Sequence, residues 1–128
     1  MSRHPLLTVE VVVLVAIGGF AGANLRYLAA ELLPGLPGTL LANVLGATLL
    51  GFLLYEAELT GLLAERTHVV VGTGFLSSFT TYSTFVVQSL QQSPLLLAGN
   101  VVATYALGFA GVLVGRRAAR AVDARWAA

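Results

Sequence analysis

Four long apolar segments constrain the fold of this chain more than any other feature. They run over about 6–30, 39–55, 69–90 and 95–115. A helix needs about twenty predominantly apolar residues to cross the hydrocarbon core of a bilayer. Because each segment approaches that length, we predict an all-α, multi-pass protein of the cell membrane. Its four transmembrane helices would form one domain over residues 1–128.

The composition narrows the possible functions further. The chain is 57% hydrophobic and 10% charged, whereas soluble domains carry about 25% charged residues. With no cysteine, disulfides, thiolate metal sites and thiol catalysis are excluded. A net charge of +1 is too small to indicate a nucleic-acid partner. We expect neither an enzyme nor a nucleic-acid-binding protein.

The arginines predict how the chain is oriented. Four crossings place both termini on one side of the membrane. That side would hold six arginines: Arg3, Arg66, Arg116, Arg117, Arg120 and Arg125. The other side has only Arg26, near the end of the first segment. Since arginines accumulate on the cytoplasmic side, we expect both termini in the cytoplasm.

Small and polar residues interrupt the apolar segments in regular stripes. Gly18, Gly22 and Arg26 recur every four residues, which predicts a seam where two helices approach closely. The fourth segment has a similar stripe: Asn100, Thr104, Gly108, Gly111 and Gly115. In the second segment, the amide of Asn43 would lie inside the membrane. Its donors and acceptor fit either an interhelical hydrogen bond or contact with a transported ligand.

The third segment is the most unusual. Seven of the nine residues from Ser77 to Phe85 carry a hydroxyl group, and two glycines, Gly72 and Gly74, precede them. This density predicts a break at the centre of the third helix, covered by protein or water. Backbone carbonyls freed by the break would suit a small cation. Hydroxyl groups and the positive edges of aromatic rings would suit an anion.

Taken together, these motifs resemble the Fluc/CrcB family of fluoride channels over nearly the whole chain. The matching pieces are Gly18-Gly19, Gly22-Ala23, Arg26-Tyr27, Gly38-Thr39-Leu40 with Asn43 and Gly46, Gly74-Phe75, and Thr80-Thr81-Tyr82-Ser83-Thr84-Phe85. The resemblance implies a channel that exports cytoplasmic fluoride passively and so lowers its toxicity. It also implies an antiparallel dimer with two fluoride pores along the interface.

The resemblance assigns roles to individual residues. It places in the fluoride pore Asn43, Tyr82, Phe85, Thr39, Ser83 and Thr84, with Arg26 near the aqueous entrance. The backbone carbonyls of Ser77 and Thr80 match those that hold a structural sodium ion at the dimer centre. Two positions depart from the family, which usually has phenylalanine at Tyr82 and glycine at Ser77. If that glycine requires positive φ, a serine would be strained there.

The charge distribution leaves the dimer partner open. An antiparallel dimer of identical chains requires insertion in both orientations, yet six arginines against one favour a single orientation. A homodimer and a heterodimer with an oppositely oriented homologue are therefore both considered. In a heterodimer, the pore residues of one subunit could diverge, which would account for Tyr82 and Ser77.

Two other functions remain as alternatives. A small proton-coupled multidrug exporter is also dimeric with four helices, but it needs a carboxylate deep in its first helix. Glu10 is the only candidate, and a negative charge at a helix N-terminus explains it more simply. The second alternative is a non-conducting subunit of a heterodimeric channel, against which the presence of Asn43 and Phe85 argues.

Overall fold

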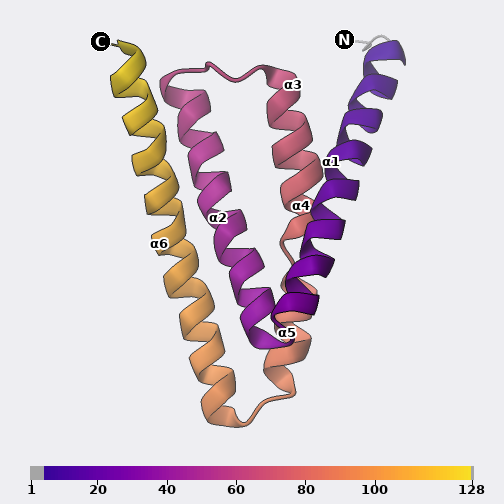
Figure 1. Ribbon diagram of the computed structural model, residues 1–128, viewed down its shortest axis with the longest axis vertical. Coiled ribbons are helices and arrows are strands. Elements are labelled where there is room, and N and C mark those ends of the chain that lie inside the picture. Colours follow the sequence, from indigo (N-terminus) through magenta and orange to yellow (C-terminus); the bar gives the residue numbers. More distant parts are fainter. Residues whose placement is uncertain (1–4, 128) are drawn as a thin grey trace.

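A computed structural model describes the backbone of residues 5–127, which are helical apart from short connections. Three helices are continuous: α1 (Pro5–Leu32), α2 (Leu36–Leu59) and α6 (Pro94–Ala127). Both ends of the described chain lie at the same end of the molecule (Figure 1). Arg3, one of the six arginines used to predict orientation, lies outside the described residues.

Four helical stretches are long and apolar enough to cross a membrane. They are Thr8–Leu32, Leu36–Leu59, Glu65–Leu90 and Pro94–Trp126. The prediction of an all-helical, multi-pass protein with four helices able to cross a membrane is thus confirmed. The last helix continues well past the predicted end at residue 115, because the alanines and arginines that follow are strong helix formers. Apolar patterning marks only the part of a helix that suits lipid.

The third crossing consists of several pieces. They are α3 (Glu65–His68), the π-helical η1 (Val69–Leu76), α4 (Ser77–Phe79) and α5 (Tyr82–Leu90). Between α4 and α5, Thr80 has φ −82° and ψ 156°, and Thr81 has φ −150° and ψ 123°. Both are extended conformations, so helical geometry is interrupted at these two residues. The Thr81 side chain accepts a hydrogen bond from the Thr84 N–H and caps the start of α5.

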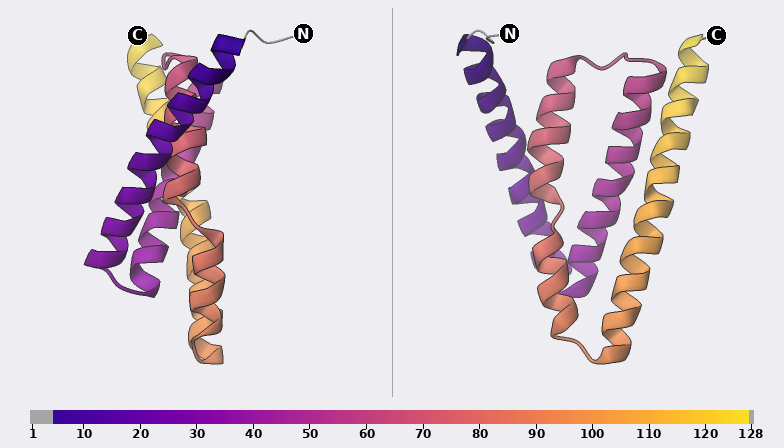
Figure 2. Two further views of the ribbon diagram at one scale, coloured as in Figure 1. Left: turned by 90° about the vertical axis from the view of Figure 1, so that its right-hand side faces the viewer. Right: turned by 180° about the vertical axis from the view of Figure 1, so that it is seen from behind.

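The helices form two packed pairs, α2 with α6 and α1 with the upper part of the third crossing. α2 lies beside α6 along most of its length, while α1 crosses the η1 and α4 pieces (Figures 1 and 2). The lower piece, α5, contacts both α2 and α6. The interruption at Thr80 and Thr81 therefore faces α2, which positions the candidate site.

Glycines allow both pairs to pack closely. A Cβ on Gly18 or Gly22 of α1 would collide with the carbonyl oxygens of Val70 and Phe75. The predicted packing seam is confirmed. In the second pair, a Cβ on Gly51 of α2 would lie 2.6 Å from the carbonyl oxygen of Val112.

Glu10 links two helices near the end of the molecule where both described ends of the chain lie. Its Oε1 lies 2.8 Å from Nε of Arg66, which links α1 to α3. Because α1 already begins at Pro5, Glu10 lies beyond the first turn, where the helix dipole acts most strongly. The interpretation of Glu10 as a helix N-terminal charge was therefore wrong, and its partner is an arginine.

Candidate functional site

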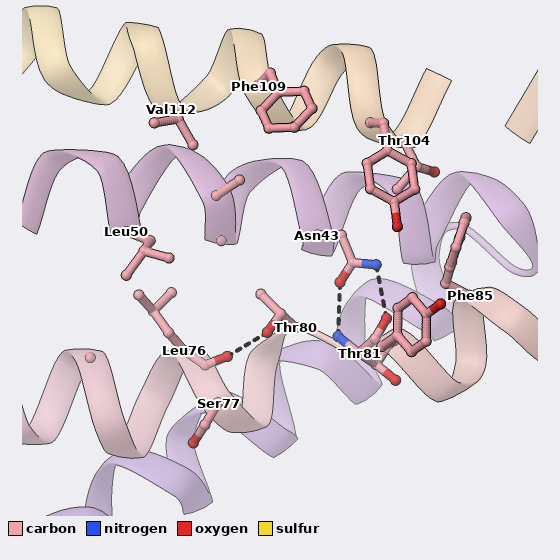
Figure 3. Close-up of a pocket in the computed structure, with 16 residues that line it drawn as sticks. Asn43, Leu50, Leu76, Ser77, Thr80, Thr81, Phe85, Thr104, Phe109 and Val112 are labelled. Carbon is pink, nitrogen blue, oxygen red and sulfur yellow. Dashed lines mark hydrogen bonds between the residues drawn. The ribbon is translucent and has the colours of Figure 1, made fainter. Parts of the chain in front are cut away.

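A cavity of about 560 Å³ lies between α2, the third crossing and α6. Its wall is mainly apolar, and its polar groups gather where the third crossing is interrupted (Figure 3). They include Asn43 on α2, Thr80 and Thr81 at the interruption, and Thr104 on α6. Three separate elements thus bring hydrogen-bonding groups to one apolar cavity.

Asn43 holds the interrupted backbone through two hydrogen bonds. Its Nδ2 donates to the Thr81 carbonyl at 2.9 Å, and its Oδ1 accepts from the Thr81 N–H at 2.8 Å (Figure 3). The two bonds together fix which end of the amide carries the oxygen. Since Nδ2 has two hydrogens, one remains for another acceptor. The interhelical and ligand-binding interpretations of Asn43 are therefore compatible.

Hydroxyl groups around the interruption are largely bonded within their own crossing. Thr80 Oγ1 donates to the Leu76 carbonyl at 2.8 Å, and Ser77 Oγ donates to the Gly74 carbonyl at 3.1 Å. Thr81 Oγ1 accepts from the Thr84 N–H at 3.2 Å and donates to Thr84 Oγ1 at 3.1 Å. This bonding lowers the cost of placing many hydroxyl groups in an apolar segment.

The same interruption deprives the backbone carbonyls of Ser77 and Thr80 of their usual helical donors. In a continuous α-helix, the Ser77 carbonyl would accept from the Thr81 N–H, and the Thr80 carbonyl from the Thr84 N–H. Here those N–H groups bond to Asn43 Oδ1 and Thr81 Oγ1 instead. Ser77 has φ −64° and ψ −25°, ordinary helical angles. The strain considered for a serine at this position therefore does not arise.

Aromatic rings form a continuous series along the cavity. The ring centroids of Tyr82 and Phe85 lie 5.9 Å apart, and those of Phe85 and Tyr105 lie 6.4 Å apart at 78°. Phe109 follows Tyr105 at 6.4 Å. Phe85 is buried, whereas Tyr82 is 71% exposed. The cavity is therefore open on the side where Tyr82 lies.

The cavity collects part of the set of residues expected in the pore. Its lining includes Asn43, Tyr82, Phe85, Ser77 and Thr80. The other expected residues lie outside that lining: Thr39 is half-buried in α2, Ser83 and Thr84 are exposed on α5, and Arg26 is half-buried in α1.

Sequence reasoning missed four residues that the structure brings to the site. They are the backbone of Thr81, the buried hydroxyl of Thr104, and the rings of Tyr105 and Phe109. Among the described residues, Thr104 Oγ1 has no hydrogen-bond partner. A signal was present, since Tyr105 and Phe109 are four residues apart beside the small-residue stripe of the fourth segment. That spacing places both rings on one helix face.

Small membrane transport proteins typically combine several helical crossings with an interrupted crossing where polar groups gather in a cavity. The chain belongs to the CrcB family: the family model "CrcB-like protein, Camphor Resistance (CrcB)" matches residues 13–116. It is 57% identical to "Fluoride-specific ion channel FluC 1" of Haloarcula marismortui over 93% of each chain. It is 56% identical to "Fluoride-specific ion channel FluC 2" of Halobacterium salinarum, covering 80% of this chain and 81% of the relative. The family resemblance inferred from the sequence is confirmed.

Proposed function

We propose that this chain is a subunit of a fluoride-selective channel that lets cytoplasmic fluoride leave the cell passively. The observation that carries the proposal is the cavity at the interruption, where Asn43 keeps one free N–H beside aromatic rings. The relatives named as fluoride-specific ion channels support the same ion. No bond breaks in this function, so no catalytic group is required.

The proposed conduction path replaces the hydration shell of fluoride with neutral donors. The free Nδ2 hydrogen of Asn43 is one donor, and the hydroxyl groups of Thr39, Ser83 and Thr84 are others. The first N–H groups of α5 add to these, because a helix start leaves its N–H groups without intrahelical partners. Ring edges of Tyr82 and Phe85 supply weak positive potential. Neutral donors hold fluoride without trapping it, as conduction requires.

The direction of flow follows from the membrane potential. A negative-inside potential favours the exit of an anion by about 2.3 kcal/mol per 100 mV. Passive export is therefore sufficient against fluoride that enters as the neutral acid. Arg26, near the end of the first crossing, would attract the ion at the aqueous entrance.

The freed carbonyls of Ser77 and Thr80 fit a structural sodium ion. Carbonyl oxygens are the ligands that hard cations prefer, and both carbonyls lost their helical donors at the same interruption. Two carbonyls do not complete a coordination shell, so the ion would need the same pair from a second subunit. Bound there, sodium would supply positive charge that holds the two interruptions together.

We further propose that the channel is an antiparallel dimer in the cell membrane. The cavity is open on one side, and the exposed rings of Tyr82, Tyr105 and Phe109 surround the opening. A second subunit there would enclose the path. The arginine distribution leaves a homodimer and a heterodimer with an oppositely oriented homologue as the two options.

Fluoride efflux from liposomes that contain only this purified chain tests the proposal. Fast loss of fluoride, with chloride retained in parallel vesicles, is the expected result. Reconstitution with sodium replaced by a bulky organic cation should abolish the flux. Loss of chloride at the same rate would contradict selectivity. No flux from folded protein until an oppositely oriented homologue is added would favour the heterodimer.

The structure also bears on the multidrug-exporter alternative. Such an exporter would need Glu10 as a proton-coupling carboxylate, but Glu10 is paired with Arg66 and its side chain is 34% exposed. An acid that is neutralised at the edge of the molecule is poorly placed to bind protons within the membrane. The pairing therefore favours the channel.

A further inference from the structure

Glu56 is a fully buried carboxylate outside the proposed pore. It lies in the last turn of α2 and is 1% exposed. Burying an ionised carboxylate is costly unless hydrogen bonds or an opposite charge compensate for it. The burial of Glu56 therefore requires compensating contacts.

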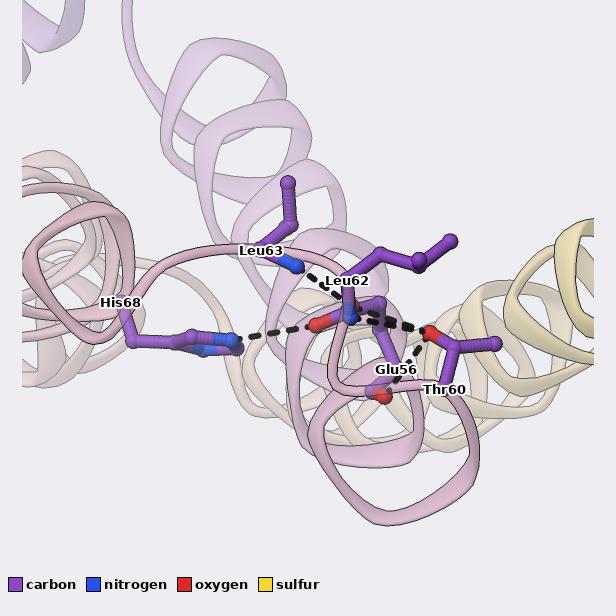
Figure 4. Close-up of polar contacts among 5 residues, drawn as sticks. All are labelled: Glu56, Thr60, Leu62, Leu63 and His68. Atoms are coloured by element: carbon purple, nitrogen blue, oxygen red, sulfur yellow. Dashed lines mark hydrogen bonds and ion pairs between the residues drawn. The ribbon is translucent and has the colours of Figure 1, made fainter.

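One carboxylate oxygen of Glu56 bonds to the connection after α2, and the other bonds to the first piece of the third crossing. Oε1 accepts from the Leu63 N–H at 2.9 Å and from Thr60 Oγ1 at 3.0 Å (Figure 4). Oε2 lies 3.1 Å from Nε2 of His68, the last residue of α3 (Figure 4). The Glu56 side chain of α2 thus binds both the connection between α2 and α3 and the start of the third crossing.

The backbone strengthens the same contact. The Glu56 carbonyl accepts from the N–H groups of Thr60 at 3.0 Å and Gly61 at 2.8 Å. Gly61 has φ 57°, a left-handed conformation that glycine adopts without strain. The chain therefore turns back sharply at the end of α2, which brings Leu63 and His68 to the carboxylate.

We propose that Glu56 and His68 form a pH-sensitive latch that positions the start of the third crossing for conduction. This inference rests on the proposed channel function. Imidazole groups change charge between about pH 5 and 8. A protonated His68 would form a charge-assisted bond with Glu56, which is stronger than the bond from a neutral ring. Protonation therefore tightens the latch.

The surrounding charges leave Glu56 as the acid bonded to His68 among the described residues. On α2, Glu58 is exposed, and on α3, Glu65 is exposed. Arg66 of α3 is paired with Glu10 of α1. On α6, the guanidinium of Arg116 lies 5.0 Å from the ring centroid of Tyr55. The response of the latch to pH thus depends on one acid and one imidazole.

The location of the latch suits the transported ion. The connection between α2 and α3 lies at the same end of the molecule as both described ends of the chain (Figure 1). In a subunit whose termini are cytoplasmic, this connection is therefore cytoplasmic as well. Each molecule of hydrogen fluoride that crosses the bilayer and ionises there releases one proton and one fluoride. The proton tightens the latch at the moment when fluoride accumulates on the same side. Acidification of that side therefore increases conduction.

The substitution Glu56→Gln tests the latch because it reverses the expected response to pH. Glutamine keeps an oxygen acceptor for the Leu63 N–H, but it places an NH₂ group against His68. That group can donate to a neutral imidazole and repels a protonated one. The matched control is Glu58→Gln, which removes an exposed acid from the same helix.

Two readouts compare the wild type and both variants between pH 8 and pH 6. The first is the hydrogen-exchange protection of the Leu63 N–H, corrected for the intrinsic effect of pH. The second is fluoride efflux, corrected with protein-free vesicles. In the wild type and Glu58→Gln, both should rise roughly threefold on acidification, as a charged donor strengthens the bond. In Glu56→Gln both should fall.

Equal pH profiles for Glu56→Gln and the wild type would overturn the latch. If Glu56→Gln does not fold, His68→Gln decides, because it keeps a donor for Glu56 but cannot titrate. A flat profile in His68→Gln supports the latch, and a profile like that of the wild type overturns it. If no protein conducts fluoride even after an oppositely oriented homologue is added, the proposed function fails, while protection of the Leu63 N–H still decides whether the latch exists.

Discussion

Two side chains of α2, Asn43 and Glu56, hold the third crossing in contrasting ways. They lie about 20 Å apart along the helix axis. Asn43 uses a neutral amide to bond both polar groups of one peptide unit, at Thr81. Glu56 uses a charged group to bond the Leu63 N–H and His68. We refer to the two bonds from Asn43 to Thr81 as the amide clamp. We refer to the bonds of the Glu56 side chain, which include the latch to His68, as the carboxylate clamp.

The difference between the clamps follows from their depth. Within the hydrocarbon, a charge is far more costly than a neutral amide, so an interrupted backbone there is best held by asparagine. At the end of α2, N–H groups of the turn and a histidine compensate for a carboxylate. The comparison teaches that side chains of α2 hold the third crossing in place, both at its interruption and at its start.

The largest expected effect comes from removing the amide clamp. Asn43→Leu leaves the N–H and the carbonyl of Thr81 unbonded in an apolar cavity, at a cost of about 1–3 kcal/mol for each group. We expect fluoride flux per folded channel to fall by at least about 100-fold. The control is Asn24→Leu, since within the described part of the chain the Asn24 amide bonds to the Phe20 carbonyl of its own helix and to no other element. Flux retained in Asn43→Leu would show that the clamp is dispensable.

A smaller effect should follow when α2 is pushed away from the interruption. A Cβ on Gly46 would collide with Cγ2 of Thr80, so Gly46→Ala should strain the amide clamp and reduce fluoride flux roughly tenfold. Adding Thr80→Ser removes that methyl group and should restore flux. Gly99→Ala is the control, because a Cβ there has no atom within 4 Å and Gly99 lies outside the lining of the cavity. Failure of the double variant to recover would contradict this reason for the loss.

Removing the carboxylate clamp should affect stability more than conduction at neutral pH. Glu56→Ala leaves the Leu63 N–H without its acceptor, while the Thr60 hydroxyl keeps only the backbone carbonyl of residue 56, and the change should cost about 2 kcal/mol. Thermal unfolding in detergent should show a lower midpoint than for Glu58→Ala. Fluoride flux per folded channel should fall only about threefold, since the amide clamp persists. A loss of flux as large as that of Asn43→Leu would remove the distinction between the clamps.

The smallest effect is expected from the cap of α5. Thr81→Ala removes the acceptor of the Thr84 N–H, at a cost of about 1 kcal/mol, but leaves both bonds to Asn43. Fluoride flux should fall about twofold, and Thr81→Ser should restore it. If Thr81→Ala were as harmful as Asn43→Leu, the cap rather than the amide clamp would hold the interruption.

Much of the fold and part of the site could be predicted from local patterns. The apolar segments predicted four crossings, and the spacing of Gly18 and Gly22 predicted a close-packing seam, whose partner η1 only the structure revealed. Asn43 stood out because an amide in an apolar segment needs a partner. The identity of that partner, the backbone of Thr81, could not be predicted, since the two residues are 38 positions apart.

The carboxylate clamp shows the same limit. In the sequence, Glu56 to His68 reads as a polar connection between two apolar segments. Its burial depends on the reversal of the chain at Gly61, which returns Leu63 and His68 to the end of α2. Likewise, the rings of Tyr105 and Phe109 joined the site only because α6 packs beside α2.

The sequence by itself determined the four apolar crossings, the side with most arginines and the hydroxyl-rich stretch of the third crossing. Transfer of a segment into lipid depends on the residues of that segment, so these features are local. Only the tertiary structure decided which groups complete the hydrogen bonds of Asn43, Thr81 and Glu56. Those partners lie on other elements, and the crossing of the helices brings them within bonding distance.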